Sequence, residues 1–410
     1  MEKITSNDFI SPEYMKDFAK FHEKIQFQEK ALVPIDDFFG MGKAWLVHRY
    51  DDALSILKDK RFLKDMRKFQ PQQIEEEKLQ ENTSVSVLVE WLKTMPNMLT
   101  VDPPDHTRLR RLVSKAFTPR MIDGLQPRIQ EIADELLDKV MDKNTMDLIE
   151  DFAYPLPILV ISEMLGIPKN DRNQFRGWTQ KIEKASLDPK QAGMVAAALE
   201  DFIRYIKALI NEKRKSPRDD VISSLIEAYE EGDKLSENEL ISTIWLLITA
   251  GHETTANLIA NGMLALMQHP EQMNLLRHNP SLLSTAVEEL LRYTGPVMII
   301  NRIAGEDIAL HEQNIRKGDN IVISIASTNL DLNKFTHPDE LNIARDEAEH
   351  LAFSTGIHHC LGAPLARLEG KIAFGTLLRR FPHLRLNTKI DQLHYQASTL
   401  RSLEKLPVTF

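Results

Sequence analysis

The stretch LSENELISTIWLLITAGHETTANLIANGMLALM limits the possible folds more than any other part of the chain. It opens with a capping box, in which Ser236 and Glu239 cap the first helical turn, and it is apolar almost all round. We therefore predict one long helix over 236–267, buried in the middle of a helical protein. Gly251 and Glu253 break the pattern at its centre, because glycine costs about 1 kcal/mol relative to alanine in a helix and a buried carboxylate needs a partner.

Helical periodicity extends over most of the remaining chain, whereas strand signals are few. Glycine is sparse, with 16 residues, and prolines or charge clusters separate the segments. Short strands are predicted at KAWLVH (43–48) and at EDIALHEQ and NIVISIAS, on either side of Gly318. The predicted fold class is mainly α with a minor β part. The other predicted helices cover 50–58, 106–117, 125–142, 156–166, 171–186, 192–215, 281–293 and 363–380.

Composition excludes several classes of protein. The chain of 410 residues has 42% hydrophobic and 27% charged residues and a formal net charge of -9, which is typical of a mildly acidic globular protein and not of a nucleic-acid-binding one. Its single cysteine cannot form an internal disulfide, which favours a reducing compartment. The N-terminus lacks an apolar signal region, and no run approaches the ~18 apolar residues of a membrane span. We expect a cytoplasmic protein without a membrane anchor.

The lone cysteine lies in FSTGIHHCLG, residues 353–362, which we call the cysteine loop. The simplest interpretation is a small buried hydrophobic residue. A zinc site is disfavoured because His358, His359 and Cys360 are consecutive, so that their side chains diverge, and no second cysteine exists. A catalytic thiol is weakly supported, since His359 cannot easily reach its sequence neighbour. The remaining interpretation is a thiolate that binds haem iron.

The residues around Cys360 suit a thiolate ligand. LGAPLARLEGKIAF follows, in which Pro364 is suited to a first helical turn, so we expect the sulfur at a helix N-terminus. Backbone N–H groups and the positive end of the helix dipole favour the thiolate there. Gly356 and Gly362 permit the turn and the close approach of a flat macrocycle, and Phe353 can shield the sulfur from water.

With its spacing F-x-x-G-x-H-x-C-x-G, this segment resembles the haem-binding loop of the cytochrome P-450 family. Further family motifs occur in the family's order over nearly the whole chain. The resemblance implies a single domain over 1–410, a triangular helical prism around a buried haem b (iron protoporphyrin IX), with Cys360 as the iron ligand. The haem is expected between the long helix and the cysteine loop. The β-rich portion is expected at approximately 30–50, 300–350 and 385–410.

Four side chains match family positions that bind the haem propionates. His106 and Arg110 lie at i and i+4 in TVDPPDHTRLRRLVSKAF, where one helix face can present both to an anion. Arg302 follows the apolar run Val297–Ile299, and His358 lies in the cysteine loop. The resemblance assigns all four to one anion cage. On the residues alone, the first segment is better read as an exposed basic helix and the second as a core strand.

The centre of the long helix, A-G-x-E-T-T, resembles the family's oxygen-binding helix. Small Ala250 and Gly251 would lie over the flat haem, and Glu253 with Thr254 would deliver protons to dioxygen. Threonine hydroxyls can also bond the preceding turn and open a groove for water. His252 is expected to be structural.

The segment EELLRY places Glu289 and Arg292 at i and i+3, where they can form a bidentate pair. This pair matches the E-x-x-R of the family, which holds the segment below the haem, and Arg345 is a candidate third member. We expect structural roles for these residues. Ser354 departs from the family pattern, because many relatives have glycine directly after the phenylalanine.

The resemblance implies an oxidoreductase, a monooxygenase that uses two electrons and two protons to split dioxygen and place one oxygen atom in a C–H bond of an apolar small molecule. A polyketide or macrolide is the expected substrate, with fatty acids, steroids and terpenoids as alternatives. The expected pocket linings are mainly apolar and comprise Val85–Met98, Trp245–Thr249, Val297–Ile299 and Ser398–Leu400.

Electrons are expected from a separate soluble ferredoxin or flavodoxin with its reductase, and the chain is expected to act as a monomer. Candidate contacts for this donor are Arg108, Arg111, Lys115 and His359. One rival function is a peroxide-driven peroxygenase, against which the acid–alcohol pair of the long helix argues. Another is a non-catalytic haem or small-ligand sensor, which leaves that pair unexplained. A helical scaffold without a cofactor has the least support.

Overall fold

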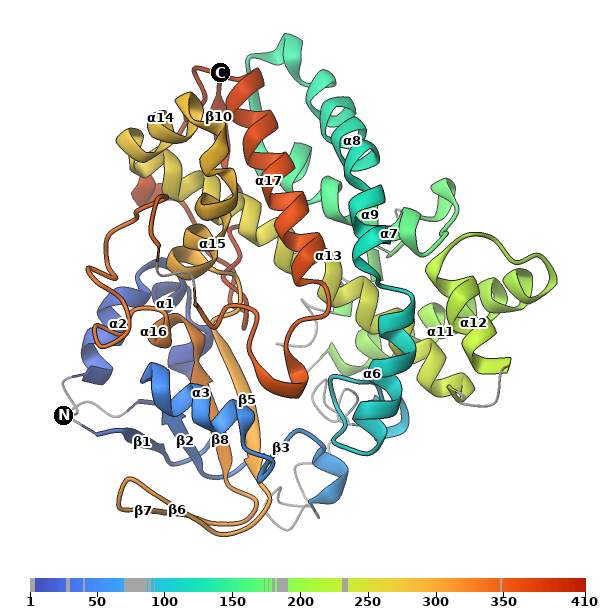
Figure 1. Ribbon diagram of the computed structural model, residues 1–410, viewed down its shortest axis with the longest axis vertical. Helices are drawn as coiled ribbons and strands as arrows, with labels where there is room; N and C mark the ends of the chain where they lie inside the picture. Colours follow the sequence, from blue (N-terminus) through green and yellow to red (C-terminus); the bar gives the residue numbers. More distant parts are fainter. Residues whose placement is uncertain are drawn as a thin grey trace. The chain divides into compact units, whose positions relative to one another are not determined.

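The computed structural model of the chain describes residues 4–26, 30–39, 41–69, 93–172, 191–230, 235–346 and 349–410, with a few single residues between these ranges (Figure 1). These residues form two compact units. The first comprises Met1–Leu63, Gly124–Pro157 and Glu253–Phe410, and the second comprises Lys64–Asp123 and Ile158–His252. The expected single domain over 1–410 stays a prediction.

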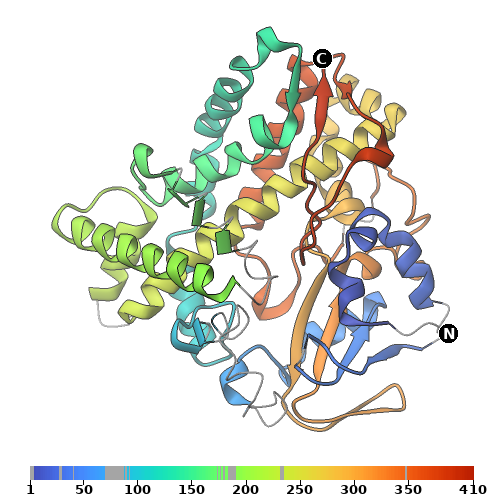
Figure 2. The ribbon, with the colours of Figure 1, turned by 180° about the vertical axis from the view of Figure 1, so that it is seen from behind.

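All strands in the described residues lie in the first unit. Its largest sheet has the order β1-β2-β8-β5-β3, in which β2 and β8 are parallel and the other neighbours antiparallel. Figure 2 shows the blue strands β1 and β2 beside the orange strands β5 and β8. Apolar side chains of the sheet pack against α3 (Tyr50–Lys58) in one core. The strands are β1 (Leu32–Ile35), β2 (Ala44–Val47), β3 (Phe62–Leu63), β5 (Ile299–Ala304) and β8 (Asn320–Ser324).

The predicted strands are present, but one of them pairs locally. EDIALHEQ contains β6 (Ile308–Leu310), which pairs with β7 (Gln313–Ile315) in a two-stranded hairpin. NIVISIAS supplies β8 to the large sheet and then turns into the short helix α16 (Ile325–Thr328). The Ser324 hydroxyl caps this helix by accepting the Ser327 N–H at 3.1 Å. The hydrogen bond of a helix cap therefore ends the strand.

A third sheet joins distant parts of the first unit in the order β4-β10-β9. Its strands are β4 (Thr145–Asp147), β9 (Arg385–Leu386) and β10 (Pro407–Thr409). The short strands β3 and β4 carry no strand signal in the sequence. Their pairing depends on neighbours far away in the chain, which a local pattern cannot reveal.

Helices of the first unit pack around α17 (Ala363–Arg380), which contacts α15 (Leu283–Thr294) and α8 (Gln126–Asp138), as Figure 1 shows. Gly370 faces α15, since a β carbon there would lie 3.4 Å from Val287. An added β carbon would therefore be in ordinary van der Waals contact with α15. The remaining α-helices of this unit with described bounds are α1 (Pro12–Lys16), α2 (Phe18–Gln26) and α14 (Pro270–His278).

The long helix predicted over 236–267 is α13 (Glu237–Gln268). Its capping box is present: the Ser236 N–H donates to Glu239 Oε2 at 2.6 Å, and the Glu239 N–H donates to Ser236 Oγ at 3.2 Å. The residues before Glu253 belong to the second unit and those from Glu253 onward to the first. One continuous helix therefore contributes to both units.

The second unit is helical in its described part. Phe202 lies beside Trp245, with ring centroids 4.7 Å apart, and Lys213 forms an ion pair with Asp220 that is almost fully buried. Its helices, of which α7 and α9 reach across the unit boundaries, are α6 (Asp105–Lys115), α7 (Pro119–Gly124), α9 (Pro155–Met164), α11 (Ala192–Lys215) and α12 (Val221–Glu230).

The mainly α fold class with a minor β part is confirmed. The helix predicted over 171–186 lies partly outside the described residues, as does the connection 64–100. None of the helices in the described part of the chain has the length and apolar character that a membrane crossing requires.

Candidate functional site

Backbone hydrogen bonds close the cysteine loop on itself. The Cys360 N–H donates to the Phe353 carbonyl at 2.9 Å, and the His359 N–H donates to the Gly356 carbonyl at 3.1 Å. Ser354 of the loop donates its N–H to the carbonyl of Leu351, which precedes the loop, at 2.8 Å. These bonds fix the position of the sulfur, while Cys360 itself is exposed. The interpretation as a buried hydrophobic cysteine is therefore wrong.

Two residues of the loop have a left-handed backbone, Ser354 with φ 57° and Gly356 with φ 71°. A β carbon on Gly356 would lie 2.6 Å from the Leu57 carbonyl oxygen of α3. Gly356 is therefore needed because the loop backbone passes close to α3. The positive φ of Ser354 is a backbone conformation that glycine adopts more readily than serine.

The sulfur lies beside the start of α17, as the sequence predicts. Gly362 is the residue before the first helical residue, and Pro364 lies in the first turn. A β carbon on Gly362 would lie 4.0 Å from Cys360 Sγ. The helix N-terminus places a positive partial charge near the sulfur, which favours its thiolate form.

The centre of α13 is less buried than the helix on either side. Ala250 is exposed and Gly251, Glu253 and Thr254 are half-buried, although most of the surrounding helix is buried. His252 is 1% exposed and its Nδ1 lies 2.7 Å from the carbonyl oxygen of the preceding turn, which fits the structural role expected of it. A long apolar helix with an accessible small residue at its middle can border a bound group.

Gly251 also lies against another helix of its own unit. A β carbon there would lie 3.4 Å from Ile161 of α9. The glycine therefore faces a neighbouring helix as well as belonging to the accessible stretch.

The four proposed propionate ligands lie on three kinds of element. His106 is buried and Arg110 half-buried on α6, where the neighbouring Arg108 pairs with the capping-box residue Glu239. Arg302 is 3% exposed on β5, and its Nη1 donates to the Asn301 carbonyl at 2.8 Å. His358 is half-buried in the cysteine loop.

The predicted site residues divide between the two units. Those of the first unit are Glu253, Thr254, Arg302, Phe353, Gly356, His358, Cys360 and Gly362, and those of the second are His106, Arg110, Ala250 and Gly251. The donor chemistry fits the expected haem. One exposed sulfur at a helix N-terminus suits a soft metal ion, and two arginines with two histidines suit carboxylates.

Each unit also brings together two of the predicted pocket linings. In the second unit, the rings of Trp91 and Trp245 lie 6.1 Å apart, edge to face. In the first, Val297 and Leu400 form an antiparallel bridge. Most of 85–92 lies outside the described residues.

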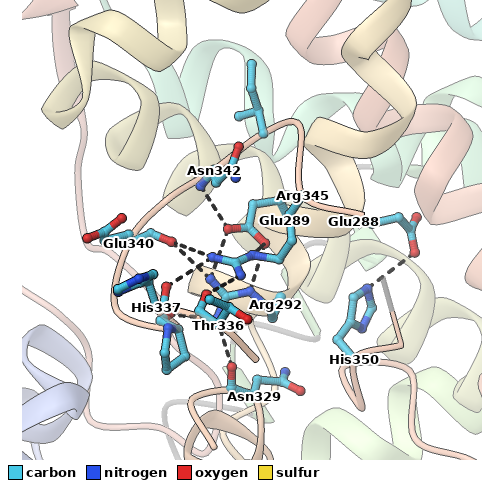
Figure 3. Close-up of polar contacts among 12 residues, drawn as sticks. Glu288, Glu289, Arg292, Asn329, Thr336, His337, Glu340, Asn342, Arg345 and His350 are labelled. Carbon is cyan, nitrogen blue, oxygen red and sulfur yellow. Dashed lines mark hydrogen bonds and ion pairs between the residues drawn. The ribbon is translucent and has the colours of Figure 1, made fainter. Parts of the chain in front are cut away.

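The Glu289–Arg292 pair is buried and has the expected third member (Figure 3). Arg292 Nε donates to Glu289 Oε2 at 2.8 Å, and its Nη2 donates to Oε1 at 2.9 Å. Arg345 Nε donates to the same Oε2 at 3.0 Å. The two arginines also donate to the main-chain carbonyls of Asn329, Thr336, His337, Pro338 and Glu340. The pair therefore holds an irregular segment by its backbone.

Four charged or titratable residues near the site were not found from the sequence: Glu288, His350, Arg367 and Glu369. Glu288 contacts His350 and Arg367, whereas Glu369 is buried on α17. The sequence offers one signal for Glu288, which is its position directly before the E-x-x-R motif. A glutamate on an exposed helix face would look the same in the sequence.

Comparisons with known proteins agree with these features. The family model described as Cytochrome P450 matches residues 87–406. The protein named Cytochrome P450 CYP107DY1 of Priestia megaterium is 60% identical over 410 residues, which is 100% of both chains. A structure of the Bacillus subtilis bacillaene polyketide synthase cytochrome P450 PksS has a TM-score of 0.88 at 42% identity, with 98% of both chains covered. The myxobacterial cytochrome P450 CYP267B1, in complex with myristic acid, has a TM-score of 0.89 at 40% identity, again with 98% of both chains covered.

Proposed function

Because the chain belongs to the cytochrome P450 family, an oxidoreductase family of monooxygenases, we propose that the Cys360 thiolate would bind the iron of a haem b. The observation that carries this proposal is the single cysteine, exposed at the start of α17 in a loop closed by its own hydrogen bonds. A helix N-terminus stabilises the anionic sulfur, and a thiolate ligand favours cleavage of the O–O bond.

His106, Arg110, Arg302 and His358 would hold the two propionates. Guanidinium groups form paired hydrogen bonds with carboxylates, and a protonated imidazole adds a further donor. Ala250 and Gly251 would border the macrocycle, because neither has a side chain that prevents a flat group from approaching. Phe353 would lie next to the sulfur and exclude water from it.

The bound haem supplies the iron at which dioxygen is reduced. In the balanced reaction a C–H bond, dioxygen, two electrons and two protons give an alcohol and one water. Glu253 and Thr254 would bring the protons, since both are half-buried at the accessible centre of α13. A carboxyl and a hydroxyl at adjacent positions can pass a proton inward from water.

The substrate we propose is an apolar small molecule of the polyketide or macrolide class. The similar PksS belongs to a polyketide synthase system, and the aromatic pair Trp91 and Trp245 offers a broad apolar surface. A fatty acid is the second candidate, because the similar CYP267B1 was solved with myristic acid. The acid–alcohol pair favours use of dioxygen over a peroxygenase reaction.

Electrons would come from a soluble ferredoxin or flavodoxin with its reductase, because P450s use redox partners. The protein would act as a cytoplasmic monomer. Arg108 is a poor candidate for the donor surface, since its guanidinium pairs with Glu239. The better candidates are Arg111, Lys115 and His359, which are all exposed.

The deciding experiment is the carbon monoxide difference spectrum of the dithionite-reduced protein. We expect a red-shifted, thiolate-type Soret band in the wild type and its loss in Cys360→Ala, because no second cysteine can replace the ligand. Ser354→Gly changes the same loop without touching the sulfur and should keep the band. A Cys360→Ala protein that retains the thiolate-type band would contradict the assignment, and a wild type without any haem band would favour the scaffold function.

A further inference from the structure

Glu288 and Glu289 are adjacent on α15, but their carboxylates make separate sets of contacts. Glu289 binds Arg292 and Arg345. Glu288 instead binds Arg367 of α17 and His350, and Figure 3 shows the His350 contact apart from the Glu289 group. The second carboxylate therefore has partners that the E-x-x-R motif does not explain.

The contacts of Glu288 connect the two sides of the cysteine loop. Arg367 Nε donates to Glu288 Oε1 at 2.7 Å and Arg367 Nη2 donates to Oε2 at 2.8 Å, which is a bidentate pair. His350 Nε2 lies 3.3 Å from Oε2. His350 precedes the loop in the chain and Arg367 follows it, so one carboxylate fixes a residue on each side of Cys360.

The two partners of Glu288 also contact Phe353, the aromatic residue of the loop. The Arg367 guanidinium carbon lies 4.6 Å from the centre of the Phe353 ring, within the range of a cation–π interaction. The His350 ring centre lies 6.0 Å from the same ring centre. Arg367 further interacts electrostatically with Cys360. A single carboxylate thus contacts both of the side chains that lie beside Phe353, and one of them, Arg367, is a cation that interacts with Cys360.

The environment keeps Glu288 ionised. Burial alone would raise its pKa, but the contacts from His350 and Arg367 outweigh burial and hold the pKa at about 2. The Glu288 side chain is 20% exposed and that of Arg367 34% exposed, so the pair is partly shielded from solvent and stronger than an ordinary surface pair.

We propose that Glu288 is a positioning residue for the thiolate: it holds Arg367 and His350 against Phe353, and so fixes the cysteine loop and sets the reduction potential of the iron. This inference rests on the proposed function, because it takes Cys360 as the iron ligand. The charges predict opposite effects for the two partners. Removing the carboxylate leaves an unbalanced positive charge near the sulfur, which favours the reduced iron, whereas removing the guanidinium leaves a negative charge, which disfavours it.

The experiment compares the holoenzymes of Glu288→Gln and Arg367→Gln with the wild type by spectroscopic redox titration. We expect a more positive midpoint potential for Glu288→Gln and a more negative one for Arg367→Gln. The thiolate-type carbon monoxide band should also decay faster in mild urea in both variants, on the order of tenfold, which is the effect of losing a hydrogen bond to a charged group.

Two further variants separate charge from geometry. Arg367→Lys keeps the charge but not the bidentate fork, so we expect a potential close to that of the wild type with faster decay of the band. Glu131→Gln removes a carboxylate that is 63% exposed and pairs with Arg128 at 2.9 Å on α8, and should change neither property. These variants keep the inference testable even if one glutamine substitution prevents haem binding.

Potentials that do not differ from those of the Glu131→Gln control, or that shift in the same direction in both glutamine variants, would overturn the inference. This failure is distinct from failure of the proposed function. In the first case the wild type still has its thiolate-type band, and in the second it has none.

Discussion

At the residue scale, burial gives Glu369 properties that no exposed carboxyl has. Glu369 is 1% exposed on α17, and its carboxyl contacts the Thr255 hydroxyl of α13. Its Oε2 atom has no hydrogen-bond partner among the described residues. Burial raises the pKa of Glu369 to about 8, and the Thr255 contact offsets only part of this change. The side chain therefore holds its proton near neutral pH.

Glu369 should make the stability of the protein depend on pH. Between 4.5, the ordinary pKa of the side chain, and about 8, the unfolded chain releases this proton while the folded chain keeps it. The free energy of unfolding should then fall as pH rises through this window, by up to about 1.4 kcal/mol per pH unit. Urea unfolding of Glu369→Gln across the window should show a flatter profile. The exposed control Glu131→Gln should retain the wild-type slope, and an equal slope in both variants would contradict the predicted burial effect.

Gly356 of the cysteine loop gives a second prediction. Gly356→Ala adds a β carbon 2.6 Å from the Leu57 carbonyl oxygen at a residue with φ 71°, so we expect a loss of about 1–3 kcal/mol in the free energy of unfolding. Gly193→Ala on α11 meets no atom within 4 Å and is the matched control. It should leave stability unchanged or slightly raise it. Similar urea midpoints for the two variants would contradict the prediction, because they would show that the loop accommodates the β carbon without a loss in the free energy of unfolding.

At the element scale, Glu289 connects α15 to the irregular segment that follows α16. Its two arginine partners are almost fully buried, with side-chain exposures of 1% for Arg292 and 7% for Arg345. The carboxylate also accepts the Asn342 N–H at 2.9 Å. One side chain of a helix thus supplies the counter-charge for two cations and orders a stretch without regular secondary structure.

Glu289→Gln should be strongly destabilising. The amide leaves two buried guanidinium groups without a counter-charge, for which we expect a loss of about 3–5 kcal/mol in the free energy of unfolding. Urea unfolding monitored by far-UV circular dichroism measures this loss, and Glu131→Gln should cost less than about 0.5 kcal/mol. A cost for Glu289→Gln no greater than that of the control would mean that water replaces the carboxylate.

The helices could be predicted from the sequence far better than the strands. The bounds of α13 and α17 lie within about a residue of the prediction, because periodicity, a capping box and an early proline are all local signals. The strand β3 has two residues and pairs only through β5, so its neighbours decide it. In the site, too, local sequence signals could be predicted and contacts between distant residues could not. Cys360 stands out by its spacing, whereas the Glu288–Arg367 pair exists only once α15 and α17 are packed together.

At the scale of the whole molecule, the chain divides into one unit that contains every described strand and one that is helical. The helical unit has a buried ion pair of its own. Lys213 and Asp220 have side-chain exposures of 3% and 4%, and Asp220 Oδ1 accepts the Ser223 N–H at 2.8 Å. This ion pair joins the end of α11 to the start of α12.

Asp220→Asn should weaken the helical unit selectively. It leaves the Lys213 ammonium buried without its counter-charge, so hydrogen exchange followed by mass spectrometry should show faster exchange in α11 and α12, with α8, α15 and α17 unchanged. Asp201→Asn, which alters an exposed pair with Arg204 on α11, is the control. Uniformly faster exchange in both units would instead show that they unfold together.

The adjacent glutamates of α15 also restrict how relatives of this chain can differ in length. An α-helix turns by about 100° per residue, so one inserted or deleted residue between Leu283 and Glu288 would rotate Glu289 away from Arg345 and Glu288 away from Arg367 at the same time. Both contacts depend on the rotation of α15 about its axis. A compensating mutation at Arg345 or at Arg367 could restore only one of them. Insertions and deletions should therefore be confined to the segments outside this helix.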